Sequence, residues 1–274
     1  MVISLLLRKR PREVLVRCIC LSRKSSSSDE RKHSVVWRFV NGAIIPSKWL
    51  GCFTRQYLFS QADILVRGYG GYNTRWALFL LHHLFPLEST KPPLATAIFF
   101  GANDSALSGR TSERQHVPIQ EYKHNLQKMV LRLKSCSPTM LIVLITPPPV
   151  CEEGRRAYAI SLYGNNAREL SERTNEVTGQ YANTCVEMAK EMGVAYINLW
   201  SKMQETEGWQ KKFLWDGLHL TPDGNAVVFQ EVIKVFNEAG LSADKMPYDF
   251  PHHSKIDDKN PGSSFQQNVC DASL

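Results

Sequence analysis

The stretch "TMLIVLITPPP", residues 139–149, joins an unbroken apolar run to three consecutive prolines. A short apolar run that is bounded by turn residues is typical of a strand buried on both faces of a sheet. Proline has no backbone N–H to donate to a neighbouring strand, so the pairing must stop there. The stretch therefore predicts a buried strand over Thr139–Thr146, inside a mainly parallel sheet.

Similar apolar runs recur along the body of the chain, and we predict strands at Ala62–Gly68, Leu94–Phe100 and Val194–Trp200. Residues at helical spacing separate these runs. They predict helices over Thr74–Phe85, Ile119–Ser135 and Asn225–Gly240, and a long helical pattern, broken or continuous, over roughly Asn165–Met192. This alternation predicts an α/β fold, a three-layer α/β/α sandwich with a central, mostly parallel sheet. In such sheets, ligands bind beyond the carboxyl ends of the strands.

The charge of the 274-residue chain is concentrated at its amino-terminal end. The formal net charge is +7, but residues 1–33 contain nine Lys or Arg and three Asp or Glu, which leaves +1 for the rest. A nearly neutral body does not indicate a nucleic-acid partner. Seven scattered cysteines suit a reducing compartment, and no apolar run is long enough to span a membrane.

These patterns divide the chain into three parts. We predict a basic, serine-rich head without structure at 1–33, one domain at 34–242 and an unstructured tail at 243–274. The expected location is the cytoplasm, although the composition of the head also allows an organelle transit segment. His252 and His253 lie in the tail without companion ligands, so we expect no metal site there.

Polar loops follow the predicted strands at three places, and they read "GYGGYNTRW" (68–76), "GANDS" (101–105) and "DGLH" (216–219). Each has a purely structural alternative. The glycines can supply a tight turn, Asn103 or Asp104 can cap a helix, and Thr221 or Asp223 can cap the last helix. The first loop lacks the Gly-Lys-Ser/Thr of a phosphate-binding loop, so a nucleotide site is a poor fit.

Taken in chain order, four blocks resemble the SGNH (GDSL) hydrolase superfamily, and in particular its isoamyl-acetate-hydrolysing type. These blocks are "ADILVRGYGGYNTRWALFLL" (62–81), "IFFGANDS" (98–105), "VLITPPPV" (143–150) and "WDGLHLTPDGN" (215–225). The resemblance extends from about Ala62 to Gly240. It implies a flavodoxin-like SGNH hydrolase fold, hydrolysis of short acyl or acetyl esters through an acyl-serine intermediate, and no metal or cofactor.

The resemblance also implies a role for four residues. His219 would be the general base, and Asp216 would orient it. Gly71, through its backbone N–H, and Asn103, through its side-chain amide, would stabilise the oxyanion. Fixed donors where negative charge develops and a base that titrates near neutrality are what this chemistry requires.

The nucleophile of the family is the part that the sequence lacks. Its serine is expected in a turn after the first strand, within "SVVWRFVNGAIIPSKWLG" (34–51), and the strand itself would be Val35–Val40. Between Ser34 and Ser47 there is no serine, threonine or cysteine. Two hypotheses follow: an esterase acting on a small-molecule ester, with its activity reduced or lost, or a relative that binds but does not hydrolyse.

Overall fold

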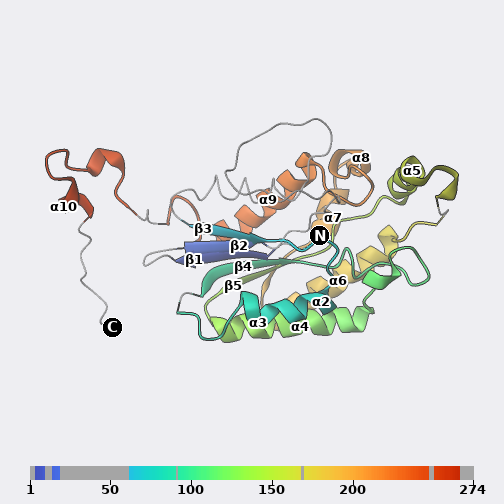
Figure 1. Cartoon of the computed structure of the whole chain (residues 1–274), viewed down its shortest axis with the longest axis horizontal. Helices are drawn as coiled ribbons and strands as arrows, with labels where there is room; N and C mark the ends of the chain where they lie inside the picture. Colours follow the sequence, from blue (N-terminus) through green and yellow to red (C-terminus); the bar gives the residue numbers. More distant parts are fainter. Residues whose placement is uncertain are drawn as a thin grey trace, which may run out of the picture.

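The computed structural model describes residues 4–9, 14–18, 62–90, 92–167, 170–246 and 250–265. Its centre is a six-stranded sheet in the order β1-β3-β2-β4-β5-β6 (Figure 1). Strands β2 to β6 run parallel to one another, whereas β1 pairs antiparallel with β2, β3 and β4. The strands are β1 Ser4–Lys9, β2 Val14–Cys18, β3 Asp63–Arg67, β4 Pro93–Phe99, β5 Leu141–Ile145 and β6 Ala195–Ile197.

Helices cover both faces of this sheet, which confirms the predicted α/β/α sandwich (Figure 1). One face carries α2 Thr74–Ala77, η1 Leu78–Leu80, α3 Leu81–Leu84, α4 Ile119–Cys136 and α6 Asn175–Met192. The other face carries α7 Leu199–Gln204, α8 Trp209–Phe213 and α9 Pro222–Glu238.

The central strands are buried on both faces, as their apolar sequences require. In β4, Ile98 packs with α4 and α6, whereas Phe99 packs with α7 and α9. In β5, Leu144 packs on the side of α4 and α6, and Val143 packs on the side of α7 and α9. Successive side chains of a strand point to opposite faces, so a strand between two helical layers needs apolar residues at every position.

The helical pattern predicted over roughly Asn165–Met192 is broken, and its long helix begins later than Asn165. Helix α6 begins only at Asn175, where the Thr174 hydroxyl caps it by accepting a hydrogen bond from Val177 N–H. Before it lie α5, Glu152–Tyr163, and η3, Gly164–Asn166. The sequence pattern did not reveal α5 because none of its residues is buried, and so it has no apolar period.

The strand predicted over Val194–Trp200 is also too long. Strand β6 ends at Ile197 because Asn198 caps α7, its side chain accepting a hydrogen bond from Ser201 N–H.

The chain ends differ from the expected unstructured head and tail. Strands β1 and β2 lie within residues 1–33, where short apolar runs, "SLLLRK" and "VLVRC", supply β-forming residues. In the tail, Met246 is buried against the cluster that includes α9, and the short helices η4 His253–Lys255 and α10 Pro261–Phe265 follow. The expected first strand, Val35–Val40, and its turn lie outside the described residues.

Candidate active site

A cavity of about 720 Å³ lies at the carboxyl edge of the sheet. It is lined by the loops that follow β3 and β4, by α5, by residues 170–173 and by the "DGLH" loop. Gly71, Asn103, Asp216 and His219 all contribute to its lining. The structure thus brings together four residues that the sequence distributes over three separate loops.

Asp216 and His219 form a hydrogen-bonded pair within one loop. Asp216 Oδ2 lies 2.7 Å from His219 Nδ1, and Oδ1 accepts from the backbone N–H groups of Leu218 and His219 at 3.0 and 2.7 Å. Burial opposes ionisation of Asp216, but the hydrogen bond and charge of His219, together with Arg155, outweigh it and lower the pKa of the carboxyl. An ionised carboxylate only accepts, so Nδ1 donates and Nε2 of the 42% exposed imidazole is left for a reacting group.

The backbone of this loop depends on a glycine. Gly217 has a φ of 80°, and its carbonyl accepts a 2.8 Å hydrogen bond from Cys151 N–H. A Cβ at this position would lie 2.3 Å from the Cys151 carbonyl oxygen and 2.5 Å from Arg155 N. The start of α5 is therefore packed directly against the loop that carries Asp216 and His219.

Asn103 is held by both ends of its side-chain amide. Its Nδ2 donates to the Tyr72 carbonyl at 2.7 Å, and its Oδ1 accepts from Arg173 Nη2 at 3.2 Å. One amide N–H remains, in a residue that lines the cavity. Gly71, with a φ of 78°, presents its carbonyl to Gln115 Nε2 at 3.0 Å, and within the described part of the chain no hydrogen bond uses its N–H.

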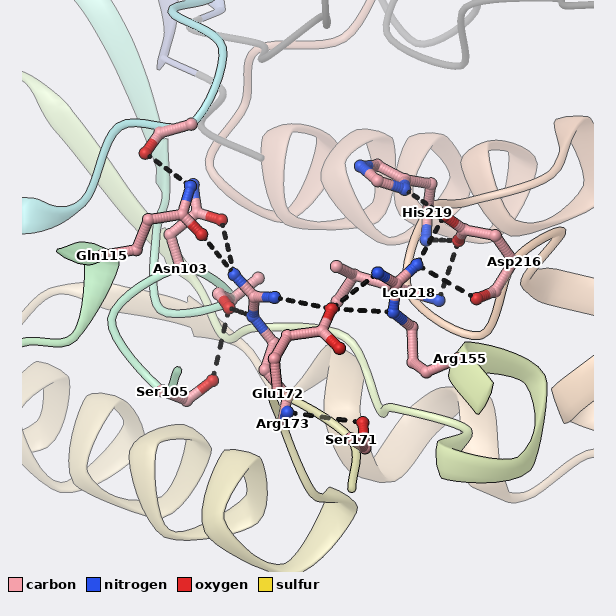
Figure 2. Close-up of polar contacts among 12 residues, drawn as sticks. Asn103, Ser105, Gln115, Arg155, Ser171, Glu172, Arg173, Asp216, Leu218 and His219 are labelled. Atoms are coloured by element: carbon pink, nitrogen blue, oxygen red, sulfur yellow. Dashed lines mark hydrogen bonds and ion pairs between the residues drawn. The ribbon is translucent and has the colours of Figure 1, made fainter. Parts of the chain in front are cut away.

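A chain of alternating charges joins these two parts of the site (Figure 2). Arg155 donates from Nη1 to Asp216 Oδ2 at 2.8 Å and from Nε and Nη2 to Glu172 Oε1 at 2.9 and 2.6 Å. Arg173 Nη1 approaches the same Glu172 oxygen at 3.1 Å. Buried charges are tolerated when each is paired and hydrogen-bonded, and this chain satisfies that condition. Although burial opposes ionisation of Glu172, the two arginines lower its pKa.

Sequence reasoning did not find Arg155, Glu172, Arg173 and Gln115. They meet through contacts between residues far apart in the sequence, such as Arg173 and Asn103, which are 70 positions apart, so no local spacing reveals them. The sequence offered only a weak signal for these arginines. They lie next to helix starts, in "GRR" (154–156) and "ERTN" (172–175). Arginine has no side-chain oxygen that could cap a helix, so its position there has no local structural reason.

The cavity also has an apolar side. Leu162 and Tyr163 of α5 and Leu170 line it, and all three are exposed. Trp215 stacks on the His219 ring with centroids 5.9 Å apart. The surfaces of Leu162, Tyr163 and Leu170 would lose contact with water if a hydrocarbon group entered the cavity.

Within the described ranges, no cluster of three or more His, Cys, Asp or Glu could hold a metal ion. No helix in that part of the chain is long and apolar enough to cross a membrane. The window expected to carry the serine, 34–51, lies outside it. Strand β2, between β3 and β4 and parallel to both, ends at Cys18 opposite Ala97, so the chain leaves β2 towards the edge that holds Asn103.

The comparisons with known proteins agree with this arrangement. Residues 38–232 match the GDSL-like Lipase/Acylhydrolase family. A GDSL esterase/lipase of Arabidopsis thaliana is 67% identical over 207 residues, which cover 76% of this chain and 86% of that protein. The isoamyl acetate-hydrolyzing esterase 1 homolog of Mus musculus is 36% identical over 213 residues, covering 77% and 82%.

A lipase/acylhydrolase from Enterococcus faecalis shares the fold, with a TM-score of 0.53 and 19% identity over 74% of this chain and 87% of the other. The family match spans more than half of the 274 residues, and the plant relative is similar over most of its own length. The chain therefore belongs to the GDSL-like lipase/acylhydrolase family.

Proposed function

We propose that this chain hydrolyses carboxylic esters that carry short acyl or acetyl groups. The observation that carries the proposal is that the His219–Asp216 pair and the Asn103 amide line the same cavity. The relatives named as esterases, among them isoamyl acetate-hydrolyzing esterase homologues, support the same reaction class.

In this reaction, His219 Nε2 takes the proton of the attacking hydroxyl and later delivers it to the leaving alcohol. Asp216 keeps the imidazole oriented and stabilises its protonated form. The free N–H of Asn103 and the backbone N–H of Gly71 stabilise the negative charge that develops on the carbonyl oxygen.

In family members with the serine, the attacking hydroxyl belongs to that residue and an acyl-enzyme forms. Without it, His219 can deprotonate a water molecule, whose oxygen adds to the carbonyl carbon while the alkoxide leaves and takes the proton. Serine proteases without their serine retain roughly 10³–10⁴-fold catalysis over water, which comes from the oxyanion hole and substrate binding. Activation of water by a positioned base contributes typically about 10²–10⁴-fold. We therefore expect slow turnover that falls when His219 is removed.

A small hydrocarbon group in the substrate fits the apolar side of the cavity. Leu162 and Tyr163 belong to a helix with no buried residue, so their exposed surfaces are free for a ligand. Each methylene group buried there stabilises the complex by about 0.8 kcal/mol. We place the hydrocarbon part of the ester, on its acyl or its alcohol side, against this surface.

A second candidate is a protein that binds the ester without hydrolysing it. The observation that favours this alternative is the lack of any serine, threonine or cysteine between Ser34 and Ser47.

Hydrolysis of p-nitrophenyl acetate by the wild type, His219→Ala and His124→Ala distinguishes the two candidates. His124 is an exposed histidine on α4, away from the cavity lining, and serves as the matched control. We expect His219→Ala to lower the rate by about 10²-fold or more and His124→Ala to leave it unchanged. Binding of the product carboxylate without any His219-dependent turnover would favour the binding protein.

We also propose that the protein acts in the cytoplasm, with an organelle as the alternative if the basic head is a transit segment. A fluorescent fusion to the full chain, compared with one that lacks residues 1–33, tests this. An organelle signal that disappears on removal of the head would contradict a cytoplasmic location.

A further inference from the structure

Arg173 occupies an unusual position for a charged residue. It lies directly before the cap of α6, and only 3% of its side chain is exposed. Nevertheless, all three guanidinium nitrogens are hydrogen-bonded, and the adjacent Glu172 carboxylate balances the charge. Burial lowers the pKa of Arg173 to about 10, which still leaves it charged at neutral pH.

On one side, this guanidinium fixes the loop that carries Asn103. Nε donates to the Ala102 carbonyl at 2.6 Å, and Nη2 donates to Asn103 Oδ1 at 3.2 Å. The Asn103 amide cannot rotate by 180°, because its NH₂ would then face the guanidinium and its oxygen would face the Tyr72 carbonyl. Arg173 therefore decides which way the remaining N–H points.

On the other side, the Arg173 guanidinium fixes the backbone at Gly71 through the side chain of Gln115. Nη2 also donates to Gln115 Oε1 at 2.6 Å (Figure 2). Gln115 Nε2 in turn donates to the Gly71 carbonyl at 3.0 Å. The Gln115 amide is oriented by the same logic, since only its oxygen can face a guanidinium.

We propose that Arg173 is the positioning residue of the oxyanion hole, and that one buried guanidinium sets both of its donors. This inference rests on the proposed ester hydrolysis at the same cavity. A donor that is preorganised before the reaction contributes to the transition state much more than to substrate binding. Loss of Arg173 should therefore lower kcat while KM changes little.

The variants are Arg173→Met, Arg173→Lys and the control Arg132→Met. Glu172 keeps its bond to Arg155 in both Arg173 variants, so no buried carboxylate loses all its partners. Lysine preserves the charge, but its single ammonium group cannot reproduce the fork that reaches Ala102, Asn103 and Gln115. Arg132, on α4, donates from Nε to the Phe85 carbonyl at 3.0 Å, so its removal costs a comparable bond away from the cavity.

We expect kcat for p-nitrophenyl acetate to fall by about 10²-fold in both Arg173 variants, similar to the loss of one oxyanion donor, with KM within about threefold. Arg132→Met should stay close to the wild type. A kcat within about threefold of the wild type in Arg173→Met, or an equal loss in Arg132→Met, would overturn the assignment.

A measurement that needs no turnover separates this inference from the proposed function. The side-chain amide resonances of Asn103, identified by their loss in Asn103→Asp, should shift in Arg173→Met and stay in place in Arg132→Met. If the wild type hydrolyses no ester, the proposed function fails, yet the shift still supports the positioning of Asn103 by Arg173. Unchanged Asn103 resonances in Arg173→Met overturn this positioning role whatever the activity.

Discussion

A Cβ on Gly217 would lie 2.3 Å from the carbonyl oxygen of Cys151, and the φ of Gly217 is 80°. Both facts exclude other residues at this point, where the loop with Asp216 and His219 meets the start of α5. Any side chain must push these two backbone segments apart, and real Cβ atoms do not approach a backbone oxygen so closely.

We predict that Gly217→Ala lowers the free energy of unfolding by about 1–3 kcal/mol and the rate of the proposed ester hydrolysis by at least about tenfold, because the loop with Asp216 and His219 must move. Gly109→Ala is the matched control, since Gly109 has a φ of 73° but nothing within 4 Å of its Cβ. Gly109→Ala therefore has the strain of a positive φ without a steric clash at the Cβ. Denaturant unfolding and hydrolysis rates should separate the two variants, and equal effects would show that the close contact is unimportant.

A second prediction concerns Asp104, which is fully buried beside Asn103. Its Oδ1 accepts hydrogen bonds from the backbone N–H and the hydroxyl of Thr74, whereas its Oδ2 has no hydrogen-bond partner among the residues that the structure describes. Burial raises the pKa of this carboxyl from 3.8 to about 6, against the opposing effect of the Thr74 hydrogen bonds. The folded state therefore binds the proton more tightly than the unfolded state. Stability is lost as pH rises from about 4 to 6, and the cost persists above 6.

Asp104→Asn should remove this cost while keeping an oxygen for Thr74. Relative to the wild type, we expect the variant to gain stability progressively between pH 4 and 6, by roughly 2–3 kcal/mol in all. The free energy of unfolding at several pH values measures the gain, with Asp244→Asn, at an exposed carboxylate, as the control. A difference between variant and wild type that does not change with pH would be inconsistent with a buried, proton-binding Asp104.

The third prediction tests the apolar side of the cavity. Leu162→Asn combined with Tyr163→Asn should reduce kcat/KM for a butyrate or isoamyl ester about 3–10-fold more than for a methyl acetate-type ester, because buried methylene groups lose their contacts. Ile160→Asn is the control, since Ile160 is as exposed as Leu162 on the same helix but does not line the cavity. The same loss in the control, or no change in chain-length preference, would exclude α5 from substrate binding.

The fourth prediction concerns the nucleophile that the resemblance implies after residues 35–40. If the turn after Val35–Val40 faces the cavity, serine at Gly42, or at Asn41, restores fast hydrolysis that disappears with His219→Ala. The rate of hydrolysis of a short acyl ester is measured for serine at each of residues 40–43. A scan is needed because attack requires the hydroxyl within about 2.6–3.2 Å of the imidazole, which a shift of one residue would prevent. Strand β2 also runs parallel to β4 and ends towards the same edge of the sheet. The alternative is therefore a nucleophile in the segment that follows Cys18, and the variants Cys20→Ala and Ser22→Ala test it. No gain in the scan, with loss of activity in either alanine variant, would contradict the expected turn.

The sequence predicted the parts of the molecule that are local. The apolar runs predicted β3, β4 and β5, because a buried strand is visible as a short apolar segment. The "GAND" and "DGLH" loops predicted Asn103, Asp216 and His219, because each loop is a short contiguous stretch of the sequence. Thr221 caps α9, as one structural alternative predicted, and it lies two residues after His219. A helix cap and the proposed base are therefore compatible in one segment.

The remaining parts depend on distant contacts. Helix α5 has no buried face, so neither its existence nor its approach to Gly217 follows from periodicity. Arg155 and Arg173 acquire their roles only when Asp216, Glu172 and Asn103 converge on them. An arginine in a sequence is ordinarily a solvated surface charge, and its burial could not be expected without the fold.

The most direct test of the account is the kcat of Asn103→Asp on p-nitrophenyl acetate, compared with the wild type and with Asn183→Asp. Aspartate has the shape of asparagine and can still accept from Arg173, but it has no N–H for the oxyanion and adds a negative charge beside it. Asn183 is exposed on α6 and controls for the change in charge. The account predicts a fall of about 10²–10³-fold in Asn103→Asp and none in Asn183→Asp; wild-type turnover in Asn103→Asp would contradict it.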